Sequence, residues 1–545
     1  MKILYFAPFS YIRDFAFPIA STINALLEDD HQVSRLVCDR SFKTYCTSMK
    51  SINLSPNASN EAKEKICQEC ISNASSMSKI KGLKTYYTSS FISDKEKEII
   101  NQYIDSLSLK SFNLDSYFGS SNLNRIAFYE VILRFKINNV LKMDNEQFEY
   151  FKNELKNCYI SLKISENFKK IHKNQTLIIL SPQYGVLNSF YTGYKTESLK
   201  TYCIEGSNNN YYKNNILRCY DWDINKLVNP AKKKWKFFKD EKFYLDKKGM
   251  KIVKKHISAM LNARSQHVYS KRKSLLRISK KFDLSKFKKT ALLNMSSNDE
   301  AFAAHVIGAF PDSKMFSKIF RTQIEWITHT INYFKNLPDY CLIIRVHPRE
   351  FANKRENVIS QHWHELKSIL RDKSIPGNII INWPQDNISF YDLINDVDVL
   401  IANNSITVVE ALYHDVPVVT YDNTITNYPD EMVYFGTSIK DYEINILLAF
   451  TEKRENLKRL ALNWFVYTQY TSNLILKNKI SSTKLFKAFR RVILILNSST
   501  LTSLLNKIEL KLSNLEEESK LIFQDVIRNN HESVLDSKII SKKNK

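Results

Sequence analysis

The segment at 343–350 combines an apolar run with residue types that bind phosphate. The residues that carry this chemistry are Arg345, His347, Arg349 and Glu350. Arginine offers a two-pronged hydrogen-bond donor to phosphate, and histidine can donate to phosphate or act as an acid or base. Because Pro348 disfavours helical backbone in the residue before it, we expect a strand to end here and to present these side chains at its carboxyl end. The alternative is a charged loop that only solvates the edge of a sheet.

A second segment, at 397–412, has an apolar run, a polar turn and a helix-forming run in succession. Its polar residues are Asn403, Asn404, Ser405 and Thr407, with Glu410 one turn further on. Free N–H groups and the helix dipole at such a turn can bind an anion without glycine. We therefore predict that Asn404, Ser405 and Thr407 bind nucleotide phosphate. Glu410 would hold ribose hydroxyls, and the alternative for the turn is ordinary helix capping.

Further candidates follow other predicted strands. Asn298 and Asp299 lie in a polar turn at 296–300 and could bind donor or acceptor, although a plain turn is an equal alternative. Asp14 follows the first predicted strand and Glu205 a later one. A general base needs a carboxylate or histidine beside the acceptor hydroxyl, so either acid is a catalytic candidate. Each could instead be a surface or capping residue.

Four cysteines lie close together in the sequence, at Cys38, Cys46, Cys67 and Cys70. Four thiolates can bind one structural zinc ion tetrahedrally, although this spacing is not that of a standard zinc ribbon. The alternative is four reduced, partly buried thiols.

The composition limits the class of protein. The chain has 545 residues, of which 43% are hydrophobic and 25% charged, which excludes wholesale disorder. Its nine glycines are too far apart for a P-loop or a dinucleotide-binding fingerprint. Any phosphate site must therefore use side chains and helix N-termini.

The formal net charge is +24, and residues 231–290 hold 21 Lys/Arg against 4 Asp/Glu. This basic stretch could be a solvated surface, or it could bind an anionic membrane or a polyanionic substrate. Nucleic acid is not an expected partner, because zinc-finger spacing and an RNP-like motif are both missing. No run of 18 apolar residues could span a bilayer, so we expect a cytoplasmic protein, with the inner face of the membrane as a candidate location.

Two series of strands and helices must position these residues. Near the start, 2–8, 15–27 and 32–38 have the pattern of a strand, a helix and a parallel strand. A second series begins near 290, with strands expected at 341–346, 378–381, 397–402 and 417–421. We predict an α/β fold with two Rossmann-like domains, 1–285 with an insertion at about 50–125, and 286–470. A helical tail follows at 471–545.

The segment at 320–420 resembles bacterial capsule and surface-polysaccharide biosynthesis proteins. The resemblance rests on Phe320, Gln323, Trp326, the 345–350 motif, Asn404-Ser405, Glu410-Ala411 and Pro417-Val418-Val419. These are glycosyltransferase-B proteins related to capsular Kdo transferases. The resemblance implies transfer of a sugar from a nucleotide-sugar donor to a capsule or lipopolysaccharide glycan or glycolipid, with no cofactor required for catalysis. It assigns donor phosphate to His347 and Ser405, and ribose or sugar to Glu410. The His414-Asp415 turn departs from the family, which usually has glycine there.

Two other readings remain open. Sugar-nucleotide epimerases and polyol-phosphate transferases have a related fold, and an epimerase needs no acceptor. A non-catalytic scaffold in polysaccharide assembly is the third reading. For it, the basic and apolar segment at 484–505 could lie on an anionic membrane or pack on its own domain.

Overall fold

The computed structural model describes most of the chain. The described residues are 1–139, 143–173, 176–206, 216–224, 231–243, 246–261, 282–310, 312–353, 357–371, 375–422, 424, 426–452, 454–477 and 514–543, with 278, 488, 492, 501 and 505. Most of the 484–505 segment and part of the basic stretch therefore lie outside the described residues. The chain divides into two compact units, the first of Met1–Glu130, Met143–Asp223 and Ser472–Lys545, the second of Val131–Lys142 and Ile224–Thr471.

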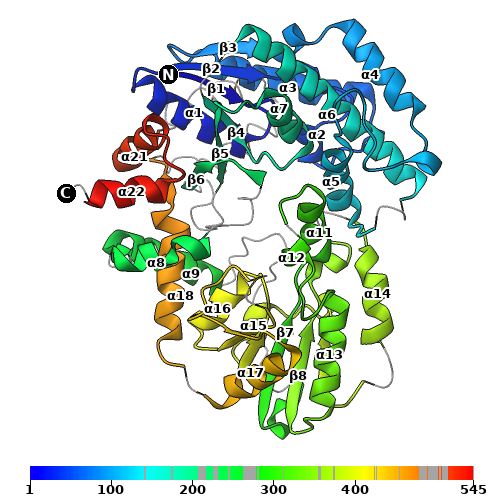
Figure 1. The fold of residues 1–545 in the computed structure, drawn as a ribbon, viewed down its shortest axis with the longest axis vertical. Coiled ribbons are helices and arrows are strands. Elements are labelled where there is room, and N and C mark those ends of the chain that lie inside the picture. Colours follow the sequence, from blue (N-terminus) through cyan, green and yellow to red (C-terminus); the bar gives the residue numbers. More distant parts are fainter. Residues whose placement is uncertain are drawn as a thin grey trace. The chain divides into compact units, whose positions relative to one another are not determined.

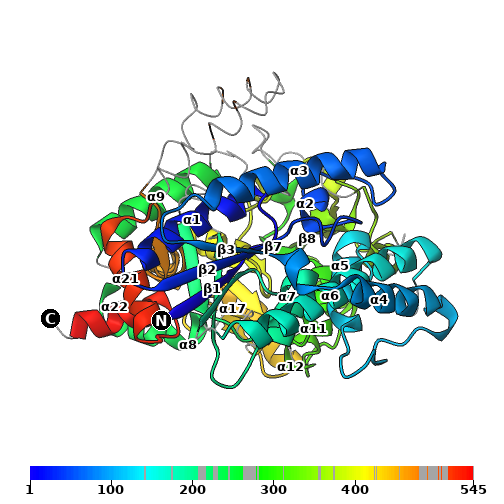
Figure 2. The ribbon, with the colours of Figure 1, turned by 90° about the horizontal axis from the view of Figure 1, so that it is seen from above.

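The first unit is built on a seven-stranded sheet of order β13-β6-β5-β4-β1-β2-β3. The strands are β1 (Lys2–Phe6), β2 (Gln32–Val37), β3 (Lys84–Tyr87), β4 (Thr176–Leu180), β5 (Lys200–Gly206), β6 (Ile216–Asp221) and β13 (Asn473–Ile475). The five strands β1 to β5 are parallel, whereas β6 pairs antiparallel with both of its neighbours. Figure 2 shows β1, β2 and β3 side by side. The predicted β-α-β start is confirmed, with α1 at Arg13–Leu27.

Helices cover this sheet. They include α2 (Thr47–Lys50), α3 (Asn60–Met77), α4 (Asp94–Ser106), α6 (Asn145–Ile171), α7 (Gly185–Tyr194), α21 (Glu517–Arg528) and α22 (Val534–Lys543). The helix α5 (Asn124–Phe135) contributes its first residues to this unit and its last to the second. The region at 50–125, which we expected to be an insertion, also adds a strand to the sheet, because β3 pairs with β2.

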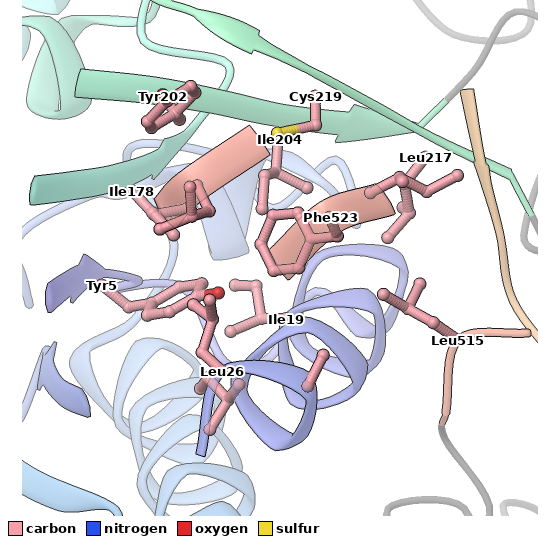
Figure 3. Close-up of a cluster of buried hydrophobic side chains, with 14 of the residues drawn as sticks. Tyr5, Ile19, Leu26, Ile178, Tyr202, Ile204, Leu217, Cys219, Leu515 and Phe523 are labelled. Atoms are coloured by element: carbon pink, nitrogen blue, oxygen red, sulfur yellow. The ribbon is translucent and has the colours of Figure 1, made fainter. Parts of the chain in front are cut away.

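The C-terminal segment is part of the core of the first unit. The strand β13 pairs with β6, and Phe523, Val526 and Val534 are buried in the same apolar cluster as Tyr5 and Ile19. Figure 3 shows Phe523 and Leu515 packed among side chains from the sheet and α1. The segment at 471–545, expected to be a helical tail, thus completes the domain in which the chain begins.

The second unit has a six-stranded parallel sheet of order β12-β11-β10-β7-β8-β9. Its strands are β7 (Lys289–Asn294), β8 (Tyr340–Arg345), β9 (Ile379–Asn382), β10 (Val399–Ile401), β11 (Val418–Thr420) and β12 (Tyr434–Phe435). Its helices include α11 (Asn298–Val306), α12 (Asp312–Met315), α13 (Gln323–Lys335), α14 (Gln361–Leu370), α15 (Phe390–Leu393), α16 (Thr407–Tyr413), α17 (Ile439–Thr451) and α18 (Leu457–Val466). The strands expected between 341 and 421 are present, because continuous apolar runs are typical of buried parallel strands.

Two basic helices belong to the second unit rather than to the first. These are α8 (Ala231–Asp240) and α9 (Lys247–Leu261), which pack on α18 and on the π-helical turn η9 (Tyr467–Thr471) (Figure 1). The N-terminal part of the first unit therefore ends at Asp223, whereas the sequence predicted that this domain continues to 285, and the chain returns to the first unit at Ser472. Aromatic contacts explain this, because Trp235 lies 5.3 Å from Trp464 and Phe238 lies 5.1 Å from Tyr467, ring centre to ring centre.

Both units have parallel sheets covered by helices, which confirms the α/β class with two Rossmann-like domains. Within the described part of the chain, none of the helices is long and apolar enough to cross a bilayer.

We predict that Phe523→Ala destabilises the first unit by about 3–5 kcal/mol, because it removes a fully buried ring and leaves a cavity. Leu521→Ala is the matched control, since Leu521 lies on the same helix and is 58% exposed. Urea denaturation followed by tryptophan fluorescence and circular dichroism measures both. Equal, small effects of the two substitutions would contradict the placement of α21 in the core.

Candidate functional site

The carboxyl edge of the second sheet has a topological switch point. From the central strand β7, the chain adds β8 and β9 on one side and then β10, β11 and β12 on the other. The connections leaving β7 and β10 therefore diverge, and a crevice at such a place is where open α/β sheets bind ligands. The predicted residues at 296–300 and 403–410 follow these two strands.

A chain of hydrogen bonds crosses this switch point. Arg345 Nη1, at the end of β8, donates to Asn294 Oδ1 at 3.3 Å, and Asn294 Nδ2 donates to Thr407 Oγ1 at 3.2 Å. Thr407 Oγ1 in turn donates to Ser405 Oγ at 2.9 Å. The Ser405 hydroxyl accepts in these contacts, so its own hydrogen is left for a further acceptor. We call these four residues the switch-point relay.

A buried carboxyl accompanies the relay. Glu410 is 4% exposed and accepts a hydrogen bond from the Tyr391 hydroxyl at 3.0 Å. Burial raises the pKa of Glu410 to about 7, while the Tyr391 hydrogen bond and the charge of Arg345 oppose that rise. Burial lowers the pKa of Arg345 to about 10, and Glu410 acts in the opposite direction. Because the Glu410 carboxyl is enclosed rather than open to ligand, its contact with ribose stays a prediction.

His347 is a neutral side chain at this edge. Its Nδ1 accepts a hydrogen bond from the Arg349 backbone N–H at 3.3 Å, which caps the short turn at Pro348–Glu350. Burial, together with the charges of Arg345, Arg349 and Lys136, lowers the pKa of His347 to about 3. An imidazole whose Nδ1 accepts carries its proton on Nε2, so His347 can offer a neutral donor to an anion.

Three of the residues predicted to bind substrate, Arg349, Asp299 and Glu350, are bonded to other groups of the protein. Arg349 Nε and Asp299 Oδ2 form an ion pair of 2.7 Å, and both side chains are 3% exposed. Arg349 Nη2 also donates to the Leu133 carbonyl at 2.7 Å, and Glu350 accepts from the Ser360 hydroxyl. Buried charged groups need such partners, so Arg349, Asp299 and Glu350 are placed to hold the loops rather than to face a ligand.

The start of α16 offers fewer free backbone groups than we expected. The N–H groups of Thr407, Val408, Val409 and Glu410 all donate within the turn, to Ser405 Oγ or to the carbonyls of Ser405 and Ile406. The turn therefore satisfies these four groups itself. An anion here would have to be bound by side chains, of which Asn404 is the most exposed, with its Oδ1 accepting from Asn427.

A pocket of about 640 Å³ lies within the second unit beside the relay. Its wall includes the predicted residue Asn298 and, next in the chain to Ser405, the predicted residue Asn404. Aromatic side chains line it at Phe302, Phe310, Phe316 and Tyr421, and polar ones at Ser296, Ser297, Thr322, Gln323 and His362. This size suits a nucleotide-sized ligand, and aromatic walls with a few polar groups are typical of cofactor and nucleotide pockets.

Sequence reasoning missed part of this wall. Gln323 Nε2 donates to the Ser296 carbonyl at 3.1 Å, and Gln323 Oε1 lies 3.2 Å from His362 Nε2. In the sequence, Gln323 is distinguished only by the resemblance of its segment to a known family. No sequence pattern indicates that His362 belongs to a binding site, because it lies within an ordinary amphipathic helix.

The catalytic candidates in the first unit have different surroundings. Asp14 lies in the first turn of α1, and its side chain is outside what the structure describes. Glu205 Oε1 forms an ion pair of 2.9 Å with Arg218 on the adjacent strand and lies 3.4 Å from the Tyr220 hydroxyl. The Glu205 carboxylate therefore has partners on β6, and its role as the base stays a prediction.

The first unit also holds a buried charge cluster that the sequence did not reveal. Lys50 Nζ lies 3.0 Å from Glu130 Oε2 and 2.8 Å from Glu154 Oε1. Burial raises the pKa of Glu154 to about 7. The N–H of Gly185, which begins α7 after β4, donates to Glu130 Oε1 at 2.9 Å. These residues are far apart in the chain, so no spacing pattern could have linked them.

The cysteine cluster does not have the geometry of a metal site. Among the described residues, no three His, Cys, Asp or Glu side chains are grouped so that they could hold a metal ion. Burial raises the pKa of Cys67 and of Cys70 to about 11, and also raises those of Cys38 and Cys46. Burial therefore keeps these thiols protonated while no metal ion is bound.

We predict that the stability of Glu410→Gln relative to the wild type increases as the pH rises from about 4.5 to about 7. A carboxyl with a raised pKa binds more protons in the folded state than in the unfolded state over this range, so the wild type loses stability as the pH rises. The expected gain is on the order of 2 kcal/mol. Denaturant unfolding at several pH values measures it, with the exposed Glu452→Gln as the matched control. A pH-independent difference would show that Glu410 is not buried as described.

We predict that protein purified under reducing conditions contains less than about half an equivalent of zinc or iron, because one tetrahedral site would take a full equivalent. Elemental analysis by mass spectrometry measures this. If the protein contained a full equivalent of metal, and if that metal were lost when Cys67 and Cys70 are replaced by serine, the prediction would be contradicted. The cysteine cluster would then be a metal site, as expected from the sequence.

Comparisons with known proteins identify no family. No family model matches the chain, and no curated protein matches it. Some solved structures have a similar fold at low identity. The β-Kdo 2,7 transferase KpsC of Thermosulfurimonas dismutans is 13% identical with a TM-score of 0.31, over 58% of this chain and 82% of that one.

Two further structures cover more of the chain. A UDP-GlcNAc 2-epimerase from Neisseria meningitidis, bound to UDP-GlcNAc, is 9% identical with a TM-score of 0.26, over 86% of this chain and 97% of that one. The spinosyn rhamnosyltransferase SpnG is 9% identical with a TM-score of 0.23, over 86% of this chain and 96% of that one. These values are too low to assign residues or a reaction, so the candidate site rests on the geometry of the chain itself.

Proposed function

We propose that this protein is a glycosyltransferase that moves a sugar from a nucleotide-sugar donor to a growing capsule or lipopolysaccharide glycan. The observation that carries the proposal is the switch-point relay beside the aromatic pocket of the second unit. A pocket of this kind can hold the nucleoside of the donor. The hydroxyl, imidazole and guanidinium groups at the strand ends would then bind the donor's phosphate.

In this proposal the relay stabilises the leaving group. As the bond between sugar and phosphate breaks, negative charge accumulates on the leaving phosphate. The Ser405 hydroxyl and His347 Nε2 would donate to that phosphate, and the charge of Arg345 would favour it from behind. Donors that are already oriented by protein contacts stabilise such charge without reorganising, so no metal ion is assigned a step.

The resemblance of 320–420 to capsule biosynthesis proteins supports the same reading. The residues that resemblance assigned to donor phosphate, His347 and Ser405, both lie at the carboxyl edge of the second sheet. The first unit would bind the glycan or glycolipid acceptor, with Asp14 or Glu205 as the base, and the reaction would take place in the cytoplasm.

A thermal-shift panel of CMP, UDP, GDP and CDP tests donor binding. A ligand at about 100 times its Kd stabilises the protein by about 2.7 kcal/mol, which gives a clear shift in Tm. We predict that one nucleotide shifts the wild type, and that Ser405→Ala weakens its affinity at least about tenfold, because a hydrogen bond to a charged group is lost.

Ser285→Ala is the matched control, since Ser285 is an exposed residue of the same unit whose hydroxyl bonds only Asp283 among the described groups. Calorimetry gives the two affinities. Equal nucleotide affinities of the wild type and Ser405→Ala would show that the switch-point relay does not contact the donor. If the protein converted the free nucleotide sugar without any acceptor, it would be an epimerase rather than a transferase.

A further inference from the structure

The helix α9 has one buried face and one basic face. The buried face fits against the second unit, where Gly249 lies so close to the Tyr470 ring that an added Cβ would be 2.5 Å from it. His256 lies 5.6 Å from Phe465, ring centre to ring centre, and Val253 and Ile257 are fully enclosed. The helix is therefore fixed in rotation, and its opposite face must point to solvent.

That opposite face consists of lysines. The exposed residues Lys247, Lys248, Lys251, Lys254 and Lys255 lie three or four positions apart along it, and we call them the α9 lysine face. They span about 12 Å along the helix axis. In the described part of the chain, no carboxylate forms an ion pair with Lys247, Lys251, Lys254 or Lys255.

This arrangement costs stability. Like charges three or four residues apart on a helix each destabilise it by about 0.2–0.5 kcal/mol. The nearest acid in the chain, Asp246, accepts the backbone N–H groups of Lys248 and Gly249 and so caps the helix. A basic face that is fixed outward, and in which Lys247, Lys251, Lys254 and Lys255 form no ion pair with a described carboxylate, is complementary to an extended anionic surface.

The helix α8 adds an exposed aromatic side chain. Trp235 and Phe238 are buried against η9, which also supports α9, whereas Phe237 is 53% exposed. The exposed Lys236 lies beside Phe237, whereas Lys232 and Lys239 of the same helix form ion pairs with Asp430 and Glu431. Figure 1 shows α8 and α9 beside α18. A soluble polyanion needs only the charges, but an aromatic ring beside lysines is typical of a helix that meets the headgroup region of a bilayer.

We propose that the α9 lysine face, together with Phe237, docks the protein on a bilayer that contains anionic lipids. The lysines supply electrostatic attraction, and the ring enters the boundary between headgroups and acyl chains. This docking is independent of the proposed reaction, because none of these residues lines the pocket or belongs to the switch-point relay.

Co-sedimentation with vesicles tests the proposal, with phosphatidylcholine alone or with about one third phosphatidylglycerol. The wild type should sediment only with the mixed vesicles, and less so at high salt. K251E/K255E should bind at least about 30-fold more weakly, since each lysine near an anionic surface contributes about 1 kcal/mol and each glutamate adds repulsion. Phe237→Ser should lower the affinity as well and leave a residual binding that salt abolishes.

K335E/K440E is the matched control, because both lysines are exposed, lie in the same unit and give the same change in charge. It should bind mixed vesicles like the wild type. Equal binding of K251E/K255E and the wild type would overturn the proposal. Binding of soluble polyphosphate through these lysines, without binding to the mixed vesicles, would also overturn it and assign the face to a soluble polyanion. The thermal-shift panel of nucleotides, repeated on K251E/K255E, shows whether this variant still binds the donor nucleotide. A loss of membrane docking can thus be told apart from a loss of donor binding.

Discussion

The half-buried guanidinium of Arg345 is the constraint around which the candidate site is arranged. A charged group that leaves water must be hydrogen bonded and matched by opposite charge, or its burial becomes costly. Here Asn294 accepts from it, and Glu410 lies within electrostatic reach, itself bonded to Tyr391. Because Asn294 is oriented by Arg345, its amide donates to Thr407, and Thr407 in turn to Ser405. The half-buried Arg345 thus orients the Ser405 hydroxyl through Asn294 and Thr407.

A second buried pair keeps the neighbouring loops in place. Arg349 joins Asp299, which follows β7, to the Leu133 carbonyl, and Glu350 is joined to Ser360 before α14. The motif at 345–350 therefore divides into two functions. Arg345 and His347 lie at the carboxyl edge of the sheet, where we propose that the ligand binds, while Arg349 and Glu350 connect the loops around it.

The sequence predicted the sheets well and the loops less well. Parallel strands such as β8 and β10 are continuous apolar runs, so their positions could be predicted. The three-residue β13 could not, since so short a strand depends on its neighbour β6 for stability. The positions of Ser405, Thr407 and Arg345 at one edge could be predicted, because each lies at or just after the carboxyl end of a parallel strand. The burial of Asp299 and Arg349 did not, because sequence alone does not show which charged residues meet a partner across the fold.

The roles proposed for Ser405, His347 and Arg345 all require that nucleotide binds at the switch point of the second unit. Hydrogen–deuterium exchange with and without the nucleotide that stabilises the protein tests it directly. The account predicts slower exchange in the backbone at 294–300 and 402–410, the two connections that diverge there, and little change along α17 or the sheet of the first unit. Protection confined to the first unit, with no change in these two connections, would contradict the account.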